Sequence, residues 1–336
     1  MQLTQVNTEV KSTINRPALR LVSTKNLERE EWLNIRKKGI GSSDAAAAVG
    51  LNPYKSQLEL WMEKTGRDAE LPQLDPNDDT SPAFWGTLLE PIVASHYTKK
   101  TSNRVRRINA VLQHADPELS WMLANIDREV IGVEDVQILE CKTAGINGSR
   151  LWKEGVPEYV QLQVMHQLAV TGKQAADVAV LLGGQHLEIY RIERDETMIA
   201  QLIELERQFW NYVETDTPPP ADGSASADRA LRCLFPKDHG ETVDFSVDEE
   251  LTVAYETLKQ VREMIGEQEK QESALKQKIQ QAMGDASRAV FASGAVTWKK
   301  AKDTLTLDTA SLLRDLPHLK EQYQALRTGS RRFLIS

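Results

Sequence analysis

The fold is decided by residues 120–145, SWMLANIDREVIGVEDVQILECKTAG. This stretch contains two runs rich in valine, isoleucine and leucine, at 120–130 and 135–145, with a turn at Ile131-Gly132 between them. Such runs, bounded by turn residues, are typical of neighbouring β-strands. A third run of the same kind lies at 104–114. We therefore expect the three segments to form part of one central sheet.

Helical patterns lie on both sides of this segment. From Pro82 the sequence is apolar at helical spacing, and residues 157–172 form a second helical stretch between Pro157 and Gly172. A strand pair at 177–184 and 186–195 and a helix at 196–213 follow. The alternation predicts an α/β (α+β) fold with a mixed central sheet flanked by helices. In the first helix we predict a buried stripe of Phe84, Leu88, Ile92 and His96, with Glu90 on its flank.

Changes in composition divide the chain into four segments. Residues 1–25 lack a periodic apolar pattern and predict an N-terminal arm, whereas residues 26–213 hold the α/β domain. Residues 214–235 are rich in Pro, Ala and Ser, which is typical of a linker. Residues 236–336 predict a C-terminal extension that contains one long amphipathic helix and a small β hairpin region.

The bulk composition bounds the class of protein. Of the 336 residues, 40% are hydrophobic, which is enough for a substantial core. The first residues have no apolar run typical of a signal peptide, and no stretch approaches the roughly 20 apolar residues of a membrane span, so we expect a cytoplasmic protein. Two cysteines without a CxxC pattern predict neither disulfides nor structural zinc. The net charge of -8 is unfavourable for nucleic acid on average, but lysine and arginine concentrate at 99–107.

The most informative chemical pattern is Asp127 followed, thirteen residues later, by Glu140-Cys141-Lys142. Because side chains alternate along a strand, Glu140 and Lys142 share one face while Cys141 points to the other. An antiparallel neighbour would bring Asp127 beside Glu140. Two carboxylates and the Cys141 carbonyl can hold a hard cation such as Mg²⁺, or Mn²⁺ in its place. Lys142 could then serve the attacking water or the charge that develops on a phosphate.

Taken alone, this pattern also occurs as surface charge on ordinary amphipathic strands, so its context decides between the two interpretations. Glu90 lies among apolar neighbours on the preceding helix, where burial of an unpaired carboxylate would be costly unless it served a metal or a cation. Gln161 lies on the following apolar helix and could bond the attacking water or a carboxylate ligand. For each of these two residues, the alternative is a polar helix flank in contact with solvent.

A turn closer to the N-terminus, Gly39-Ile-Gly-Ser-Ser-Asp44, places the hydroxyl groups of Ser42 and Ser43 at the start of a helix. Free backbone N–H groups at a helix start favour anions. A plain N-cap is the competing interpretation. Arg36 on the preceding helix can bind a phosphate bidentately, which makes a phosphate pocket the better interpretation of the group.

Together these motifs resemble the lambda-exonuclease-like, or YqaJ-type, viral recombinase nucleases of the PD-(D/E)xK superfamily. Five motifs follow the order of that family: W-x3-R-x2-G-I-x-S-S-D at 32–44, W-G-x3-E at 85–90, I-D at 126–127, L-E-C-K at 139–142 and Y-V-Q-L-Q at 159–163. Ordered matches over residues 26–213 are far more specific than any single one. One departure is Ile126 before Asp127, where the family often has a proline, and it changes the loop while keeping the ligand.

The resemblance implies a role for each matching residue. It implies metal binding by Asp127, Glu140 and the Cys141 carbonyl, service of the nucleophile by Lys142 and Gln161, support of the metal water or a second ion by Glu90, and binding of a 5′-terminal phosphate by Arg36, Ser42 and Ser43.

The resemblance also implies an activity and partners. The activity is metal-dependent 5′-to-3′ digestion of one strand of linear double-stranded DNA, which leaves 3′ single-stranded overhangs for single-strand-annealing recombination. The partners are duplex DNA ends, a single-strand annealing protein and further copies of the chain in a ring, commonly a trimer. Two alternatives stay open: a structure-selective or site-specific endonuclease of the same fold, and a non-catalytic DNA-end binding protein.

Overall fold

The structure is a computed structural model that describes residues 18–72, 75, 77–326, 329 and 331–335. The chain divides into two compact units, residues 1–235 and 236–336. Most of the predicted N-terminal arm, residues 1–17, lies outside the described residues. Its last part forms a strand at 19–23.

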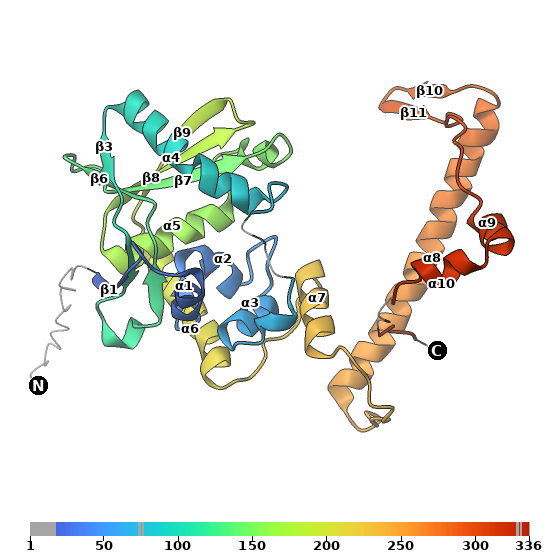
Figure 1. Cartoon of the computed structure of the whole chain (residues 1–336), viewed down its shortest axis with the longest axis horizontal. Coiled ribbons are helices and arrows are strands. Elements are labelled where there is room, and N and C mark those ends of the chain that lie inside the picture. The colour runs from blue at the N-terminus through green and yellow to red at the C-terminus, as the bar shows by residue number, and fades with distance from the viewer. Residues whose placement is uncertain (1–17, 73–74, 76, 327–328, 330, 336) are drawn as a thin grey trace, which may run out of the picture. The chain divides into compact units, whose positions relative to one another are not determined.

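The first unit alternates helices and strands along most of its length (Figure 1). Its strands are β1 (Leu19–Ser23), β2 (Ile40–Gly41), β3 (Arg104–Arg106), β4 (Ala110–Gln113), β5 (Met122–Ala124), β6 (Arg128–Ile131), β7 (Ile138–Ala144), β8 (Ala175–Leu182) and β9 (His186–Glu193). Its α-helices are α1 (Arg29–Arg36), α2 (Ala45–Ala48), α3 (Gln57–Lys64), α4 (Pro82–Thr101), α5 (Glu158–Thr171), α6 (Glu196–Glu214) and α7 (Ala225–Leu234). Short 3₁₀ turns lie at η1 (Ser42–Asp44), η2 (Asp68–Glu70), η3 (Pro117–Leu119) and η4 (Gly148–Trp152).

The larger sheet is mixed, as the sequence predicts. Within the described residues it has five strands in the order β3-β6-β7-β8-β9. β7 and β8 run parallel and α5 is the crossover between them, whereas the other neighbours are antiparallel. β6 pairs with β7 so that Arg128 lies opposite Leu139. The next position in this register sets Asp127 opposite Glu140, which is the juxtaposition predicted from the sequence.

Helices cover both faces of the larger sheet. α4 packs against β7, β8 and β9, and its residues Val93 and Tyr97 share a hydrophobic core with Leu139. α5 packs against β8, and its residues share a second core with Ile138. Adjacent residues of β7 therefore enter different cores, because side chains alternate along a strand. The mixed α/β fold with a central sheet flanked by helices is confirmed.

A smaller sheet, with strands in the order β1-β4-β5-β2, contacts the other side of α5 through β4 and β5. β2 pairs in parallel with β5, and Ile40 lies opposite Met122. A Cβ atom at Gly39 would collide with the backbone carbonyl oxygen of Trp121. Only glycine therefore lets β2 approach β5 this closely. This approach brings the turn after Gly39 to the segment that leads into Asp127.

The buried face of α4 differs from the predicted stripe, which is wrong. Leu88 and Ile92 are 51% and 55% exposed, whereas Val93 and Tyr97 are buried. The hydroxyl group of Tyr97 donates a hydrogen bond to Asp177 Oδ2 on β8 (2.6 Å). This polar contact and close packing against the sheet fix the rotation of the helix, and neither can be deduced from apolar spacing along α4 alone.

Part of the stretch predicted as a linker, 214–235, is helical. α7 packs against α3 of the same unit. Ser226 Oγ accepts a hydrogen bond from the Ser56 backbone N–H (2.8 Å), and Arg229 donates to Glu59 Oε2 (2.5 Å). The division between the two units therefore falls after α7.

The second unit contains α8 (Glu249–Met283), which has 35 residues. β10 (Arg288–Phe291) and β11 (Gly294–Thr297) pair as an antiparallel hairpin. α9 (Thr309–Asp315) and α10 (His318–Tyr323) follow. The predicted long helix and hairpin are both present.

Candidate active site

The two predicted metal ligands, Asp127 and Glu140, lie opposite each other next to the start of β6 and are called the carboxylate pair here. Asp127 Oδ2 accepts a hydrogen bond from the Cys141 backbone N–H (2.8 Å), which fixes this carboxylate against the backbone of β7. Glu140 is 3% exposed. The Cys141 side chain joins the core beneath α4, while Glu140 and Lys142 face α5. The strand alternation predicted for these three residues is therefore present.

Glu140 is held by two glutamines of α5 and by Lys142. Gln163 Nε2 donates to Glu140 Oε1 (2.6 Å), and Gln167 Nε2 donates to Glu140 Oε2 (2.8 Å). The Lys142 ammonium lies 2.8 Å from Glu140 Oε1 and also donates to Gln163 Oε1 (2.8 Å). Because residues four apart lie on one face of a helix, Gln163 and Gln167 reach the sheet together.

Gln161 does not join this network. Its Nε2 donates to the backbone carbonyl oxygen of Val156 (2.6 Å), one turn before it. Gln161 lies two residues from Gln163, and a helix turns by about 200° over two residues. The structure therefore brings Gln163, the last residue of the Y-V-Q-L-Q motif, to Lys142 in place of Gln161.

The carboxylate pair is electrostatically unbalanced. Removal from water and the neighbouring Glu140 charge raise the pKa of Asp127 to about 8, and the hydrogen bond from Cys141 only partly offsets them. Burial lowers the pKa of the Lys142 ammonium, but the adjacent Glu140 outweighs that effect and the net pKa lies above its usual value. Lys142 is consequently a cation at neutral pH. One ammonium serves two carboxylates, so Asp127 keeps its proton up to about pH 8, and a bound cation would take the place of that proton.

The carboxylate pair fits a small divalent cation. Among the described residues, no group of three or more His, Cys, Asp or Glu side chains is arranged to hold a metal ion. Mg²⁺, however, commonly takes only one or two carboxylates and completes its shell with water and phosphate oxygens. Gln167 Oε1 is buried and has no hydrogen-bond partner within the described residues, as expected beside a hydrated site. Asp127, Glu140 and the Cys141 carbonyl are the oxygen donors that could hold such an ion.

Glu90 lies near the carboxylate pair but is engaged with two arginines. Its Oε1 accepts from Arg128 (2.5 Å) and from Arg107 (3.2 Å). Arg128 is buried, and it also donates to the backbone carbonyl oxygen of Asp127 (2.6 Å). Glu90 therefore reaches Asp127 through Arg128. The sequence predicts either a metal or a cation as the partner of Glu90, and the structure shows cations, Arg128 and Arg107.

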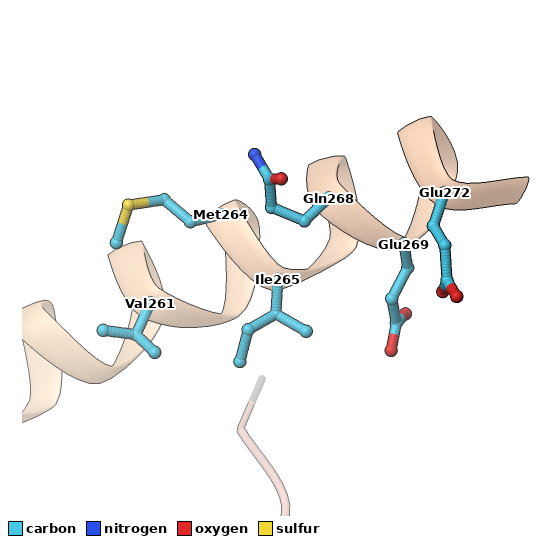
Figure 2. Close-up of a pocket in the computed structure, with 6 residues that line it drawn as sticks. All are labelled: Val261, Met264, Ile265, Gln268, Glu269 and Glu272. Atoms are coloured by element: carbon cyan, nitrogen blue, oxygen red, sulfur yellow. The ribbon is translucent and has the colours of Figure 1, made fainter. Parts of the chain in front are cut away.

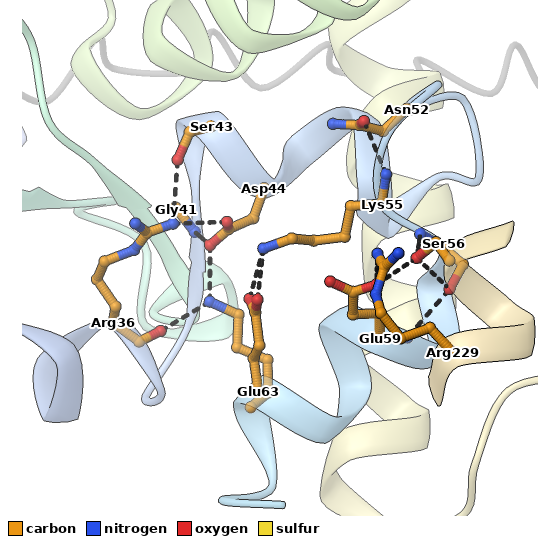
Figure 3. Close-up of polar contacts among 12 residues, drawn as sticks. Arg36, Gly41, Ser43, Asp44, Asn52, Lys55, Ser56, Glu59, Glu63 and Arg229 are labelled. Atoms are coloured by element: carbon orange, nitrogen blue, oxygen red, sulfur yellow. Dashed lines mark hydrogen bonds and ion pairs between the residues drawn. The ribbon is translucent and has the colours of Figure 1, made fainter. Parts of the chain in front are cut away.

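Two of the predicted phosphate residues, Arg36 and Ser43, lie beside the buried Asp44 carboxylate, as Figure 3 shows. Arg36 donates to Ser43 Oγ (3.0 Å) and to Asp44 Oδ1 (2.6 Å), and its guanidinium lies over the Trp32 ring at 4.8 Å from the centroid. The Lys64 ammonium lies 2.7 Å from Asp44 Oδ2. The group of Arg36, Asp44 and Lys64 is called the cationic cluster here, because two cations surround one carboxylate.

The cationic cluster is deeply set but open on one side. Asp44 is 2% exposed, whereas Ser43 is exposed and the Arg36 side chain is 27% exposed. Burial opposes ionisation of Asp44, but Arg36 and Lys64 outweigh it and hold the pKa of this carboxyl well below its usual range. Burial lowers the pKa of the Lys64 ammonium. The partly exposed Arg36 guanidinium beside the exposed Ser43 hydroxyl group is therefore the part of the cluster best suited to an anion.

Ser42 connects the two groups of charges. Its Oγ donates to the backbone carbonyl oxygen of Asn125 (3.5 Å). Gln167 Nε2 donates to the same oxygen (3.1 Å) and to Glu140. Ser42 is buried, so among the predicted phosphate residues Ser43 and Arg36 are the accessible ones. The turn after Gly39 is thereby fixed to the loop that carries Asp127.

A buried ion pair fixes the strand before this loop. His166 on α5 contacts Glu206 Oε1 through Nδ1 (2.7 Å) and the Leu123 carbonyl oxygen through Nε2 (2.9 Å). Both ring nitrogens face oxygen acceptors, so the doubly protonated ring fits best. Burial lowers the pKa of His166, but Glu206 outweighs it and the pKa is raised. α6, α5 and β5 are thus joined two residues before Asn125.

Sequence reasoning missed four contributors: Lys64, Arg128, Gln163 and Gln167. Arg128 directly follows Asp127, and Gln163 was quoted within a motif without a role of its own. The i, i+4 spacing of Gln163 and Gln167 was the available signal for a shared helix face. No comparable signal marks Lys64, which lies 20 residues from Asp44.

Comparison with known proteins places this geometry in context. A family model described as the YqaJ-like viral recombinase domain matches residues 31–174. The protein YqaJ of Bacillus subtilis, which carries the description uncharacterized, is 34% identical over 320 residues, covering 94% of this chain and 96% of that protein. The chain belongs to the YqaJ family. This membership confirms the resemblance that the ordered motifs predict.

The YqaJ match also reaches further than the motifs. Because it spans 94% of the chain, it extends into residues 236–336, where the sequence motifs gave no resemblance. Solved structures with similarity include an alkaline exonuclease from Laribacter hongkongensis (23% identity, 56% of this chain and 94% of that one, TM-score 0.46). A phage-related exonuclease from Haemophilus somnus is also similar (9% identity, 55% and 99% coverage, TM-score 0.37). None of the described helices is long and apolar enough to cross a membrane.

Proposed function

We propose that this YqaJ family member is a metal-dependent deoxyribonuclease. The observation that carries the proposal is the carboxylate pair opposite each other in strand register, with Lys142 on the same face as Glu140. A divalent cation, Mg²⁺ or Mn²⁺, would supply polarisation of a phosphoryl oxygen and activation of water when bound. The donors are hard oxygens, which suit these two ions.

The chain's own residues have separable tasks in this proposal. Asp127 and Glu140 hold the cation, and the Cys141 N–H keeps Asp127 in place. Lys142, as a permanent cation, stabilises negative charge on the phosphate under attack, because charge complementarity matters most where charge develops. Gln163 bonds both Glu140 and Lys142, so it fixes the distance between ligand and ammonium.

We assign the choice of strand end to the cationic cluster. A 5′-terminal phosphate carries more charge than an internal phosphodiester, and the Arg36 guanidinium beside the exposed Ser43 hydroxyl offers donors to it. End binding there, with cleavage at the carboxylate pair, gives 5′-to-3′ exonuclease action on linear duplex DNA. The products are 3′ single-stranded overhangs, which suit a single-strand annealing protein as partner. Assembly into a ring such as a trimer is part of the same proposal.

The test is digestion of linear duplex DNA labelled separately at each 5′ and 3′ end, with Mg²⁺ and with EDTA, beside a closed circular duplex. We expect metal-dependent release of mononucleotides from 5′ ends and an intact circle. Cutting of the circle would instead indicate an endonuclease. Binding of ends without any metal-dependent cleavage would indicate a non-catalytic end-binding protein. Lys142→Ala, tested in parallel, shows whether the activity belongs to this site.

A further inference from the structure

The second unit presents a long helix with almost no core of its own. α8 has 35 residues and is therefore about 52 Å long. Among residues 236–326, 329 and 331–335, only Met283 is buried. No other described helix or strand packs extensively along α8. Most helical stability in proteins comes from packing of an amphipathic face, and a unit of this size normally buries a core, so we expect α8 to have a partner surface.

The apolar positions of α8 follow a heptad. Spacings of three and four residues alternate without a break through ten positions, and this repeat is typical of a two-stranded coiled coil. Two of the ten are polar, Gln268 and Glu272. The other eight are Leu251, Ala254, Leu258, Val261, Ile265, Leu275, Ile279 and Ala282.

Most of this line of residues is open to solvent, and only Leu258 and Ile279 among the eight are half-buried. Val261, Ile265 and Leu275 are 38%, 51% and 63% exposed. Figure 2 shows the centre of the helix, where Val261 and Ile265 project from the same side next to a hollow that Glu269 and Glu272 also line. Such a long apolar stripe can be buried along its whole length only against a partner surface of similar length.

We propose that the occupant is α8 of a second copy of this chain, bound antiparallel. With the two helices centred between Gly266 and Glu267, every heptad position meets its counterpart over the whole length. Leu258 then lies opposite the partner's Leu275, and Ile265 opposite the partner's Gln268. The heptad positions of α8 therefore have the same spacing when read from either end, so two antiparallel copies can pair along the whole helix.

Charge selects the antiparallel direction. In the antiparallel register Arg262 flanks the core and lies opposite the partner's Glu269. Because the pair of helices has two-fold symmetry, this ion pair occurs twice. A parallel pair would set Glu272 against the partner's Glu272 inside the core and would form no ion pair at the flanking positions. In the antiparallel pair Glu272 lies opposite the partner's Val261, and Lys276 of its own helix lies 2.6 Å from its carboxylate.

The first test is sedimentation equilibrium of the full chain across a concentration series. We expect association that Glu269→Arg weakens about tenfold or more, since two ion pairs become like-charge contacts. Arg262→Glu should weaken it similarly, and the double variant R262E/E269R should restore it. Glu263→Arg makes the same change of charge on the opposite face of α8 and is the matched control. A monomeric wild-type chain, or equal behaviour of E269R and E263R, overturns the proposal.

Cross-linking fixes the direction. Leu258→Cys and Leu275→Cys chains are oxidised separately and as a mixture, with the wild-type chain as the background for Cys141 and Cys233. We expect a disulfide-linked dimer in the mixture and none above background in either single preparation. Cross-linking of Leu258→Cys with itself would show a parallel pair and contradict the antiparallel register. Absence of any cross-link in the mixture would contradict the pairing of these positions.

Discussion

The carboxylate pair and the cationic cluster lie in the same unit and are both largely enclosed, yet their charges are unbalanced in opposite directions. Asp127 and Glu140 share the ammonium of Lys142, whereas Asp44 lies between two cations, Arg36 and Lys64. A fold that only needed stable ion pairs would balance each group. The proposed function accounts for the difference, because it assigns a cation to the first group and the terminal phosphate of a DNA strand to the second.

The largest effect should come from removing the cation beside the carboxylate pair. We expect Lys142→Ala to lower the rate of duplex digestion on the order of 1000-fold, because the ammonium acts where charge develops. Binding of DNA ends should change only a few-fold. Lys153→Ala, which removes an exposed lysine, is the control. Digestion at the wild-type rate in K142A would remove Lys142 from the mechanism.

Unbalancing the cationic cluster further should affect folding. Asp44→Ala leaves two cations without their carboxylate, and breaking a buried pair in this way costs about 3–5 kcal/mol. The free energy of unfolding from denaturant titration measures it. Asp228→Ala removes the partner of Arg232 in an exposed ion pair and should cost at most about 1 kcal/mol. Similar losses in the two variants would mean that Asp44 is not a structural centre.

The two glutamines of the Y-V-Q-L-Q motif can be tested against each other. Gln163 contacts Glu140 and Lys142 in the structure, whereas the resemblance assigns service of the nucleophile to Gln161. We expect Gln163→Leu to lower digestion about 10–100-fold, since it loosens both Glu140 and Lys142. Gln161→Leu should stay within about threefold, because its side chain bonds Val156. The rates of both variants under saturating metal measure this. A larger loss in Q161L would restore the role that the motif assigns to Gln161.

Metal binding should depend on pH in a direction set by Asp127. Its pKa is raised to about 8, so below that pH a cation must displace a proton. Affinity for Mn²⁺ should fall about tenfold per pH unit below 8 and level off above it. In the metal-free chain, the neutral carboxyl stabilises the fold at low pH, and this contribution is lost as pH rises towards 8. Equal affinity at pH 6 and pH 9 would contradict the raised pKa.

The smallest effect concerns the exposed hydroxyl group of Ser43, which lies beside the cationic cluster. Ser43→Ala removes one hydrogen-bond donor, and we expect the preference for 5′-phosphorylated over unphosphorylated ends to fall about threefold. Competition between the two kinds of end in one digestion measures this ratio directly. An equal loss of rate on both ends would assign Ser43 to general DNA contact.

The sequence was sufficient for the parts of the site that depend on one element at a time. Alternation along β7 put Glu140 and Lys142 on one face, and the antiparallel neighbour brought Asp127 to them. The sequence was insufficient where the contacts depend on how far a helix is rotated about its axis relative to the sheet. The buried face of α4 and the choice of Gln163 over Gln161 both depend on how a helix turns against the sheet, and apolar spacing along the helix does not record that rotation.

The measurement that tests the central claim most directly is calorimetric titration of Mn²⁺ into the full chain above pH 8, without DNA. The wild-type chain and Lys142→Ala should both bind the ion, whereas Asp127→Asn should bind it on the order of 100-fold more weakly, because a neutral amide replaces a charged ligand. Binding that is equal in the wild-type and D127N chains, or absent from the wild type at millimolar Mn²⁺, would contradict the account.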